Sequence, residues 1–377
     1  MKVCVISLNA LPALSKQHEH QYAGGAEVQL AQFAMALAKL GHDVSMVVGD
    51  FGQPDGAMYE RVRTLKTFKS SAGLRGFRFI HPRCTTLWAA LSRANAEVYY
   101  YSCAGMILGM LAIFCRLHQR RLVFRAASDS DCDPRTLLSK YWRDRWLYEY
   151  GLRRSDAVLV QSATQQAAMQ SNYGVSSTIV CGLVEQPLAD SASQPKDIDV
   201  LWVANLRQLK RPDRFLDLAK AMPEYRFHMV GGPVPGEEDF YRQIETNASG
   251  LPNLTFHGKV SYLEIGRLFD RTRLLANTSE IEGFPNTFLQ AWVRGVPVVT
   301  MFDPDGLVSR EALGSSHETV DQMVCGSASL LRSSDMYEQA RATALAFMAQ
   351  RFDQDKVLGP YLDALTGIKR EVHACNG

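Results

Sequence analysis

One segment in the second half of the chain combines residue types that suit the binding of a charged ligand. A predicted helix over 287–294 follows it and ends at Gly295. Glycine lets a backbone approach a ligand closely, and the free amides at the start of a helix attract anions. The segment therefore predicts a phosphate-binding site. In sequence it is Ser279-Glu280-Ile281-Glu282-Gly283-Phe284-Pro285-Asn286.

Two polar side chains in this region are separated by seven residues. Glu282 precedes the predicted helix and Gln290 lies on it. Both side chains can face one site and form hydrogen bonds with hydroxyl groups. The alternative is an acidic group that caps the helix and a Gln that is exposed to solvent. The spacing alone does not decide between these two interpretations.

Three blocks of sequence together resemble glycosyltransferase family 4. They are Glu-Gly-Phe-Pro-Asn at 282–286, Gln-Ala-Trp at 290–292 and Gly-Val-Pro-Val-Val at 295–299. The resemblance covers nearly the whole chain, including 24–27, 41–44 and 203–212. It implies an α/β GT-B fold, in which two Rossmann-like domains face each other across a cleft. It also implies retaining transfer of a sugar from a nucleotide diphosphate-sugar.

The resemblance assigns roles to individual residues of the second half. In the family, the first Glu of a Glu-x7-Glu motif contacts the donor sugar, and the second contacts the ribose. Glu282 matches the first position, whereas Gln290 replaces the second Glu. An amide still donates and accepts hydrogen bonds, but the lost charge leaves donor affinity and nucleotide choice open. The expected donor-binding set also includes Gly231, Gly283, Phe284, Pro285 and Asn286.

A basic segment follows the first predicted strand of the second half. By resemblance, its Arg207 and Lys210 form the basic pair that binds the diphosphate. Arg suits bidentate contact with phosphate and Lys acts as a point charge. Negative charge builds on the diphosphate as the glycosidic bond breaks, which such cations stabilise. The alternative, a solvated helix start, is the expectation for Arg211 and Arg214.

The first half contributes further candidates. Gly24 and Gly25 are expected to bring backbone amides to the diphosphate or to the acceptor, whereas Glu27 only favours the helix N-terminus electrostatically. Many family members carry a donor-site His at a position where this chain has Ser128-Asp129. We therefore count Asp129, the nearest acidic replacement, among the catalytic candidates.

The Asp-x-Asp-x-Asp pattern at 129–133 resembles part of a calcium loop. Pro134 and Lys140 occupy positions that such a loop needs for Gly and Glu, which excludes it. We expect Asp131 and Asp133 to be structural, with Asp133 capping a helix that begins at Pro134. The nine histidines form no ligand cluster. No metal and no cofactor other than the donor substrate is expected.

Hydrophobic periodicity predicts two regions of alternating strands and helices. We expect one domain over 1–185, binding the acceptor, with 355–377 crossing back onto it, and one over 197–354, binding the nucleotide-sugar. A Pro- and Ser-containing stretch over 183–196 is the candidate linker. The expected strands are 2–8, 43–48, 98–101, 122–126, 157–161, 199–204, 226–230, 254–257, 273–277 and 297–301. The expected helices are 26–40, 105–117, 134–154, 212–222, one near 261, 287–294, 335–350 and 355–365.

Charge and cysteine usage limit the partners and the location. The 377 residues carry a formal charge of +2, so no nucleic-acid partner is expected. Eight cysteines without a Cys-x-x-Cys pair indicate a reducing compartment, and we expect a cytoplasmic protein. The uncharged run 98–115 is interpreted as a strand and a packed helix rather than a membrane span. The helix 134–154 and the cluster 118–121 predict weak peripheral association with the inner membrane face, through anionic lipid.

The sequence therefore predicts a metal-independent hexosyltransferase of polysaccharide or glycoconjugate synthesis. Its acceptor is expected to be a glycan, a lipid-linked molecule or a small molecule. Two alternatives remain at this point. One is a nucleotide-sugar epimerase on the same fold. The other is a non-catalytic nucleotide-sugar-binding subunit, which Gln290 and the missing His suggest.

Overall fold

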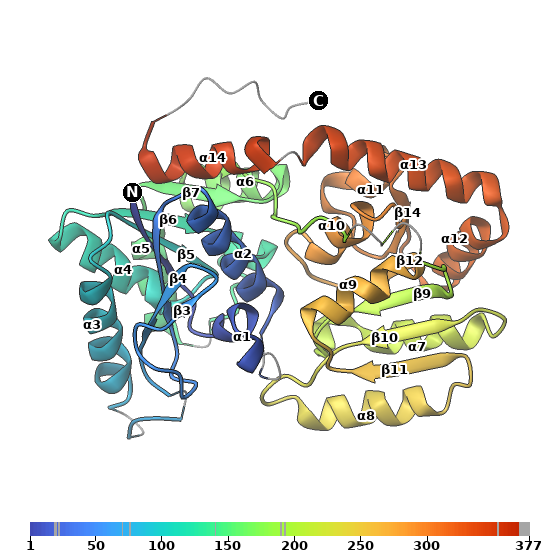
Figure 1. Cartoon of the computed structure of the whole chain (residues 1–377), viewed down its shortest axis with the longest axis horizontal. Helices are drawn as coiled ribbons and strands as arrows, with labels where there is room; N and C mark the ends of the chain where they lie inside the picture. The colour runs from blue at the N-terminus through green and yellow to red at the C-terminus, as the bar shows by residue number, and fades with distance from the viewer. Residues whose placement is uncertain are drawn as a thin grey trace. The chain divides into compact units, whose positions relative to one another are not determined.

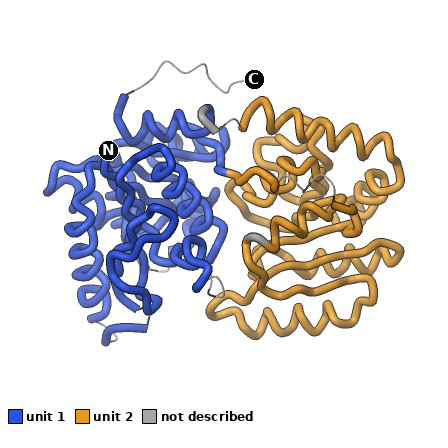
Figure 2. The backbone as a smooth tube through the Cα atoms, viewed as in Figure 1, with its two compact units in different colours: residues 1–183, 355–377 blue, residues 184–354 orange. Residues whose placement is uncertain are grey.

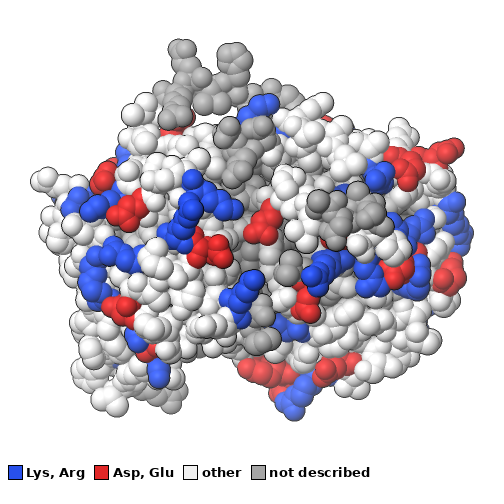
Figure 3. Space-filling view, viewed as in Figure 1, with Lys and Arg blue, Asp and Glu red and all other residues white. Residues whose placement is uncertain are grey.

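The computed structural model divides the chain into two compact units (Figure 2), and each unit has its own sheet. Unit 1 comprises residues 1–183 and 355–377, and unit 2 comprises 184–354. The structure describes residues 1–368 except 19–20, 22, 70, 75–76, 140, 189–190, 192–193 and 353, and it leaves the side chains of 263, 354 and 355 undescribed. On the face drawn in Figure 3, basic and acidic side chains are interspersed on both units.

The sheet of unit 1 has the strand order β3-β4-β2-β1-β5-β6-β7-β8 (Figure 1). All its pairings are parallel except that of β3 with β4. Its central strands are continuous apolar runs, as parallel strands covered on both faces usually are. The strands are β1 (Lys2–Ile6), β2 (Asp43–Val48), β3 (Met58–Tyr59), β4 (Val62–Lys66), β5 (Val98–Ser102), β6 (Arg121–Arg125), β7 (Ala157–Val160) and β8 (Thr178–Ile179).

Helices cover both faces of this sheet, as alternate residues of β5 show. Tyr99 packs against Phe114 of α4, with ring centroids 5.3 Å apart, whereas Tyr100 packs at 4.5 Å against Phe33 of α2. Tyr361 of α14 joins this second face and donates a hydrogen bond to the Cys181 carbonyl. The helices are α1 (Leu11–Leu14), α2 (Gly25–Lys39), α3 (Thr85–Ala94), α4 (Met106–Leu117), α5 (Trp142–Leu152), α6 (Ala163–Tyr173) and α14 (Gln354–Thr366).

The uncharged run 98–115 forms β5 and most of α4, as the sequence predicts. Two glycines let the backbones of α4 and α5 touch. A Cβ atom on Gly109 would lie 2.4 Å from the Leu147 carbonyl oxygen, and one on Gly151 would lie 2.5 Å from the carbonyl carbon of Leu108. In the described part of the chain, no helix has the length and apolar character needed to cross a membrane.

The predicted helix over 134–154 is wrong in its first third. α5 begins only at Trp142, so no helix starts at Pro134 for Asp133 to cap. The Asp133 carboxylate binds the Arg135 guanidinium at 2.7 Å, while Leu137 is buried in the core. A local ion pair and a buried anchor therefore replace the first turns of the expected helix.

Unit 2 has an all-parallel sheet with the order β11-β10-β9-β12-β13-β14. Trp202 and Phe227 bury one face of it against Phe215 of α7. The strands are β9 (Ile198–Val203), β10 (Phe227–Val230), β11 (Leu254–Gly258), β12 (Thr272–Asn277), β13 (Val298–Thr300) and β14 (Gly314–Ser316). The helices are α7 (Pro212–Ala221), α8 (Glu238–Ser249), α9 (Tyr262–Asp270), α10 (Asn286–Trp292), α11 (Leu307–Arg310), α12 (Val320–Arg332) and α13 (Ser334–Arg351).

Two half-buried histidines on adjacent strands of unit 2 are expected to make its stability depend on pH in the acid range. His228 of β10 and His257 of β11 share a 2.9 Å hydrogen bond between their rings. Burial, and then the neighbouring charge on His257, lower the pKa of His228 from 6.5 to about 4. Because the folded pKa lies below the unfolded one, the unfolded state binds the proton first as the pH falls. The stability that neutral His228 contributes is present above pH 6.5 and is lost toward pH 4.

We therefore expect the His228→Asn variant to have a flatter dependence of melting temperature on pH between 6.5 and 4 than the wild type. His118→Asn, which changes an exposed histidine of unit 1, is the matched control and should keep the wild-type slope. Thermal unfolding at a series of pH values measures both. An unchanged slope in His228→Asn would assign the acid sensitivity to other groups.

Candidate active site

Two loops at the carboxyl ends of β9 and β12 are tied together by hydrogen bonds. These strands are neighbours in the sheet, so their ends bring the loops that follow them to one edge. The Glu280 amide donates to the Leu209 carbonyl at 3.0 Å. The buried Thr278 hydroxyl donates to the Lys210 carbonyl at 2.9 Å and accepts a hydrogen bond from Trp202 Nε1 at 3.0 Å. This arrangement fixes the backbone at Lys210 beside the segment that leads to α10.

Lys210 and Glu282, which the sequence predicts as site residues, form an ion pair. Lys210 Nζ lies 2.5 Å from Glu282 Oε1, and the side chains are only 20% and 14% exposed. The Ser279 hydroxyl donates to the same carboxylate oxygen at 2.7 Å. The pair places a cation suited to phosphate next to an acceptor suited to hydroxyl groups.

Arg207 lies in the same loop but has a different partner. Its Nε is 3.5 Å from Glu237 Oε1, and the other oxygen of Glu237 accepts the Gln208 amide at 3.1 Å. Glu237 was missed by the sequence analysis because it lies in the loop after β10, 30 residues further along the chain. The structure thus joins Lys210 with Glu282 and holds Arg207 to a separate carboxylate.

Arg211 and Arg214 are not the solvated basic residues that the sequence suggests. Arg211 binds both Asp213 and Glu280, and Arg214 binds Glu280 at 3.2 Å. These hydrogen bonds raise the pKa of Arg211. The ion pairs clamp the start of α7 to the loop that carries Glu282.

Gln290 has partners of its own. Its side-chain Nε2 donates to the Tyr262 hydroxyl at 2.8 Å. Its backbone carbonyl accepts a hydrogen bond from the Arg294 guanidinium at 3.1 Å. Arg294 is also paired at 2.7 Å with Asp270, and both of these side chains are nearly buried. The sequence analysis missed Tyr262. A small hollow of about 70 Å³ is lined by these residues together with Glu185, Gln186, Leu188, Gly266 and Arg267.

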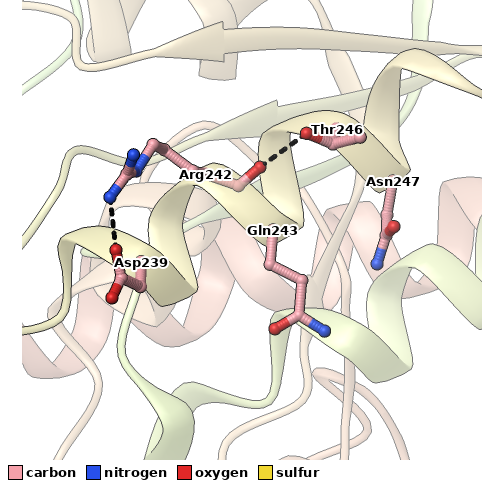
Figure 4. Close-up of a pocket in the computed structure, with 5 residues that line it drawn as sticks. All are labelled: Asp239, Arg242, Gln243, Thr246 and Asn247. Carbon is pink, nitrogen blue, oxygen red and sulfur yellow. Dashed lines mark hydrogen bonds and ion pairs between the residues drawn. The ribbon is translucent and has the colours of Figure 1, made fainter.

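A larger hollow of about 360 Å³ lies on α8, and none of the predicted site residues lines it. Figure 4 shows five of its side chains along this helix. Arg242 pairs with Asp239, and the Thr246 hydroxyl donates to the Arg242 carbonyl at 2.8 Å. These polar groups are satisfied within the helix itself, so we do not assign the site to this hollow.

The predicted donor-site glycines and their neighbours have clear structural positions. A Cβ atom on Gly231 would lie 2.1 Å from the Ala204 carbonyl oxygen, so packing alone explains this glycine. Gly283 is buried, and the Phe284 ring lies edge-on to Trp292 at 6.2 Å. Pro285 directly precedes α10, which begins at Asn286, one residue before the predicted start.

The candidates of unit 1 lie after β6 and before α2. Asp129 accepts a hydrogen bond from Gln165 Nε2 at 2.9 Å. Gly24 is buried and Gly25 is exposed at the start of α2. Asp131 is buried and accepts the Ala127 amide at 2.7 Å, so it is structural, and burial raises its pKa. Within the described residues, no group of three or more His, Cys, Asp or Glu is placed to hold a metal ion.

Family models match both units. The model described as Glycosyltransferase Family 4 matches residues 23–182, and the model described as Glycosyl transferases group 1 matches residues 197–323. No curated protein matches the chain at a significant level.

Solved structures of glycosyltransferases match nearly the full chain. Sucrose-phosphate synthase from Thermosynechococcus elongatus has 16% identity and a TM-score of 0.76, covering 97% of this chain and 99% of its own. Anabaena HepE in complex with UDP-glucose has 16% identity and a TM-score of 0.74, covering 98% and 100%. WaaG, a glycosyltransferase involved in lipopolysaccharide biosynthesis, has 14% identity and a TM-score of 0.64, covering 96% and 98%.

The two parallel-sheet units and these matches define a glycosyltransferase with the GT-B fold. The two family models together match most of the chain and both describe glycosyltransferases, which confirms the resemblance to glycosyltransferase family 4 seen in the sequence. The epimerase alternative finds no support in these matches.

Removal of the Lys210 side chain tests its predicted role. We expect Lys210→Ala to lower kcat by about 10²–10³, the usual cost of removing a preorganised donor to transition-state charge. Lys220→Ala removes an exposed lysine of α7 and should leave kcat unchanged. Steady-state kinetics and melting temperatures measure both variants. A Lys210→Ala enzyme with wild-type kcat and kcat/KM would falsify the role.

Replacement of Gln290 tests the predicted contact with the ribose. Gln290→Ala should raise the donor KM with a smaller effect on kcat, because one neutral hydrogen bond contributes about 0.5–1.5 kcal/mol. Gln290→Glu restores the family residue and should preserve or strengthen donor binding. Tyr262→Phe removes the hydroxyl that accepts the hydrogen bond from Gln290 and leaves Gln290 in place, so it is the matched control. If Gln290→Ala shifts KM no more than Tyr262→Phe does, the side chain acts only through Tyr262.

Proposed function

We propose that this glycosyltransferase transfers a hexose, with retention of configuration and without a metal, from a nucleotide diphosphate-sugar to a glycan or lipid-linked acceptor. The pathway proposed is the synthesis of a cell-surface polysaccharide or glycoconjugate. Unit 2 binds the donor and unit 1 contributes the acceptor site. In unit 1, Gly24 and Gly25 are the candidates for backbone contacts with the diphosphate or the acceptor, and Asp129 is a catalytic candidate. No cofactor other than the donor substrate takes part.

The observation that carries this proposal is the ion pair between Lys210 and Glu282 at the ends of β9 and β12. A diphosphate that approaches Lys210 competes with the carboxylate for the ammonium group. Once released, Glu282 is free to accept hydrogen bonds from the hydroxyl groups of the donor sugar. The two charges thus match the two parts of a nucleotide-sugar, the anionic diphosphate and the neutral polyol.

The chemical step follows from this arrangement. The bond between the anomeric carbon and the diphosphate oxygen breaks, and the diphosphate leaves with the electron pair. Lys210 and Arg207 stabilise the negative charge on the leaving group. The acceptor oxygen attacks the oxocarbenium-like anomeric carbon on the same face, and its proton passes to the departing phosphate oxygen.

The donor and the location are proposed on separate grounds. HepE structures carry UDP or UDP-glucose, so a UDP-sugar is the first donor to test.

We place the protein on the cytoplasmic side, with weak peripheral association at the inner membrane face, where a lipid-linked acceptor is accessible. A nucleic-acid partner is not proposed, since the formal charge is only +2.

A second function is favoured by two departures from the family pattern. Gln290 replaces the second Glu, and Ser128-Asp129 stands where many members carry a His. A chain with these replacements that bound a nucleotide-sugar without transfer would be a non-catalytic partner subunit. Donor binding without release of nucleoside diphosphate would distinguish this case.

A thermal-shift screen of nucleotide diphosphate-sugars tests the proposed donor class. A ligand at 100 times its dissociation constant stabilises the folded state by about 2.7 kcal/mol, so the true donor should raise the melting temperature. Lys210→Ala should reduce this shift, and Lys220→Ala should not. Release of nucleoside diphosphate in the presence of candidate acceptors then tests transfer. The absence of stabilisation by every nucleotide-sugar in the screen would contradict the proposal.

A further inference from the structure

The most exposed large apolar side chains of the described residues lie in two short segments of unit 1. Four such side chains are more than 70% exposed, and all four lie within 74–80 or 138–146. They are Leu74 at 78%, Phe77 at 72%, Leu138 at 74% and Trp142 at 81%. The same segments contain three more that are exposed by 55–61%, namely Ile80, Tyr141 and Trp146. An apolar cluster of this kind on a folded unit indicates an interaction surface.

The two segments lie side by side, because Arg143 joins them. Its guanidinium carbon lies 3.8 Å from the ring centroid of Phe79, at the end of the first segment, and 5.9 Å from that of Tyr141. Arg143 also forms an ion pair with Asp144 at 2.7 Å, which holds the guanidinium in place. This contact joins the two segments, and we call their seven exposed apolar residues, with the basic residues among them, the aromatic–basic patch.

The charge around the patch is positive. The segment 74–80 contains Arg75 and Arg78 and no acidic residue, whereas Lys66 and Arg93 outside it are paired with Asp50 and Asp55. Arg78 and Arg145 are exposed within the patch segments themselves. Asp144 is the single acidic residue of 138–146, and Arg143 neutralises it. A partner of the patch must therefore accept apolar side chains and carry negative charge.

We propose that the aromatic–basic patch docks the protein onto an anionic lipid bilayer. Exposed Trp and Tyr rings with interspersed Arg suit the boundary between lipid headgroups and acyl chains. Basic residues near that boundary are attracted to anionic lipid. A nucleic acid would use the cations but not the exposed Leu and Ile side chains. The inference rests on the proposed function, because it supplies the surface that brings the enzyme to a lipid-linked acceptor.

This patch differs from the surface that the sequence suggests. The expected surface included the cluster 118–121, but Arg120 donates to Asn95 and Arg121 donates to the Ala364 carbonyl. Arg145 of the patch likewise donates to the Ser139 and Leu137 carbonyls, so the patch is distinguished by its apolar residues, which include the four most exposed large ones of the described chain. The segment 74–83, which shows no helical or strand period, supplies the exposed apolar residues that complete the patch.

Flotation of the full-length protein with lipid vesicles tests the proposal. The protein should float with vesicles that contain phosphatidylglycerol and not with phosphatidylcholine alone, and high salt should reduce the bound fraction. Phe77→Ala with Trp142→Ala should abolish flotation. Arg78→Glu with Arg145→Glu should lower the membrane partition coefficient by about tenfold or more. Each basic residue near an anionic surface raises this coefficient about fivefold. Leu40→Ala with Met58→Ala changes two exposed apolar residues of unit 1 outside the patch and should float like the wild type.

Several outcomes would overturn the proposal. They are protein that stays at the bottom with anionic vesicles, equal flotation with neutral vesicles, and wild-type flotation of both patch variants. Concentration-dependent self-association that is lost in the patch variants would instead identify an interface between copies. Stabilisation by the nucleotide-sugar is the separate measure of the proposed function. Patch variants should keep it, so that loss of membrane binding and loss of donor binding are distinguishable.

Discussion

The candidate site depends on one buried hydroxyl group. Thr278 is fully buried, and its hydroxyl both accepts from Trp202 Nε1 and donates to the Lys210 carbonyl. Trp202 belongs to β9, and Thr278 directly follows the neighbouring strand β12. The hydrogen bonds therefore connect the core of the sheet to the loop that carries Lys210. Buried polar groups are nearly always paired, so this loop cannot leave its position without leaving Thr278 unsatisfied.

The cations around this loop are neutralised by carboxylates of unit 2. Lys210 pairs with Glu282, Arg207 with Glu237, and Arg211 with Asp213 and Glu280. Exposed pairs contribute little stability, so Arg207, which is 39% exposed, can exchange Glu237 for a phosphate at low cost. The less exposed Lys210 and Glu282 are held more firmly. Exchange at that pair therefore favours a ligand that offers both an anion for Lys210 and hydroxyl groups for Glu282.

The sequence predicts well what local patterns determine. β2 lies at 43–48 as expected, because an apolar run follows the glycine that ends α2. Lys210 and Glu282 were found because their motifs are local, and the structure brings them together. The predicted start of α5, at Pro134, was wrong. The pairing of Asp133 with Arg135 and the burial of Leu137 compete with helix formation there. Neither contact has a periodic signature.

Other features depend on contacts between distant parts of the chain. Glu237 reaches Arg207 from the end of another strand, and Tyr262 reaches Gln290 from another helix. No spacing in the sequence reports such pairs. The aromatic–basic patch was predicted only in part for the same reason: the sequence indicated its segment 138–146 but not its segment 74–80. Trp142 is visible as an aromatic residue, but its exposure depends on which face of α5 packs against α4.

The structure also explains how the site can accommodate Gln290 in place of a glutamate. Arg294 donates to the Gln290 carbonyl and is paired with the nearly buried Asp270 of α9. A buried pair of this kind contributes little net stability, but breaking it is costly, so it fixes α10 relative to α9. Arg294 therefore holds the Gln290 backbone independently of the side chain at 290, which adds its own hydrogen bond to Tyr262 of α9. A change between Glu and Gln at this position acts on the charge offered to the ligand, while the geometry of the helix that carries it is retained.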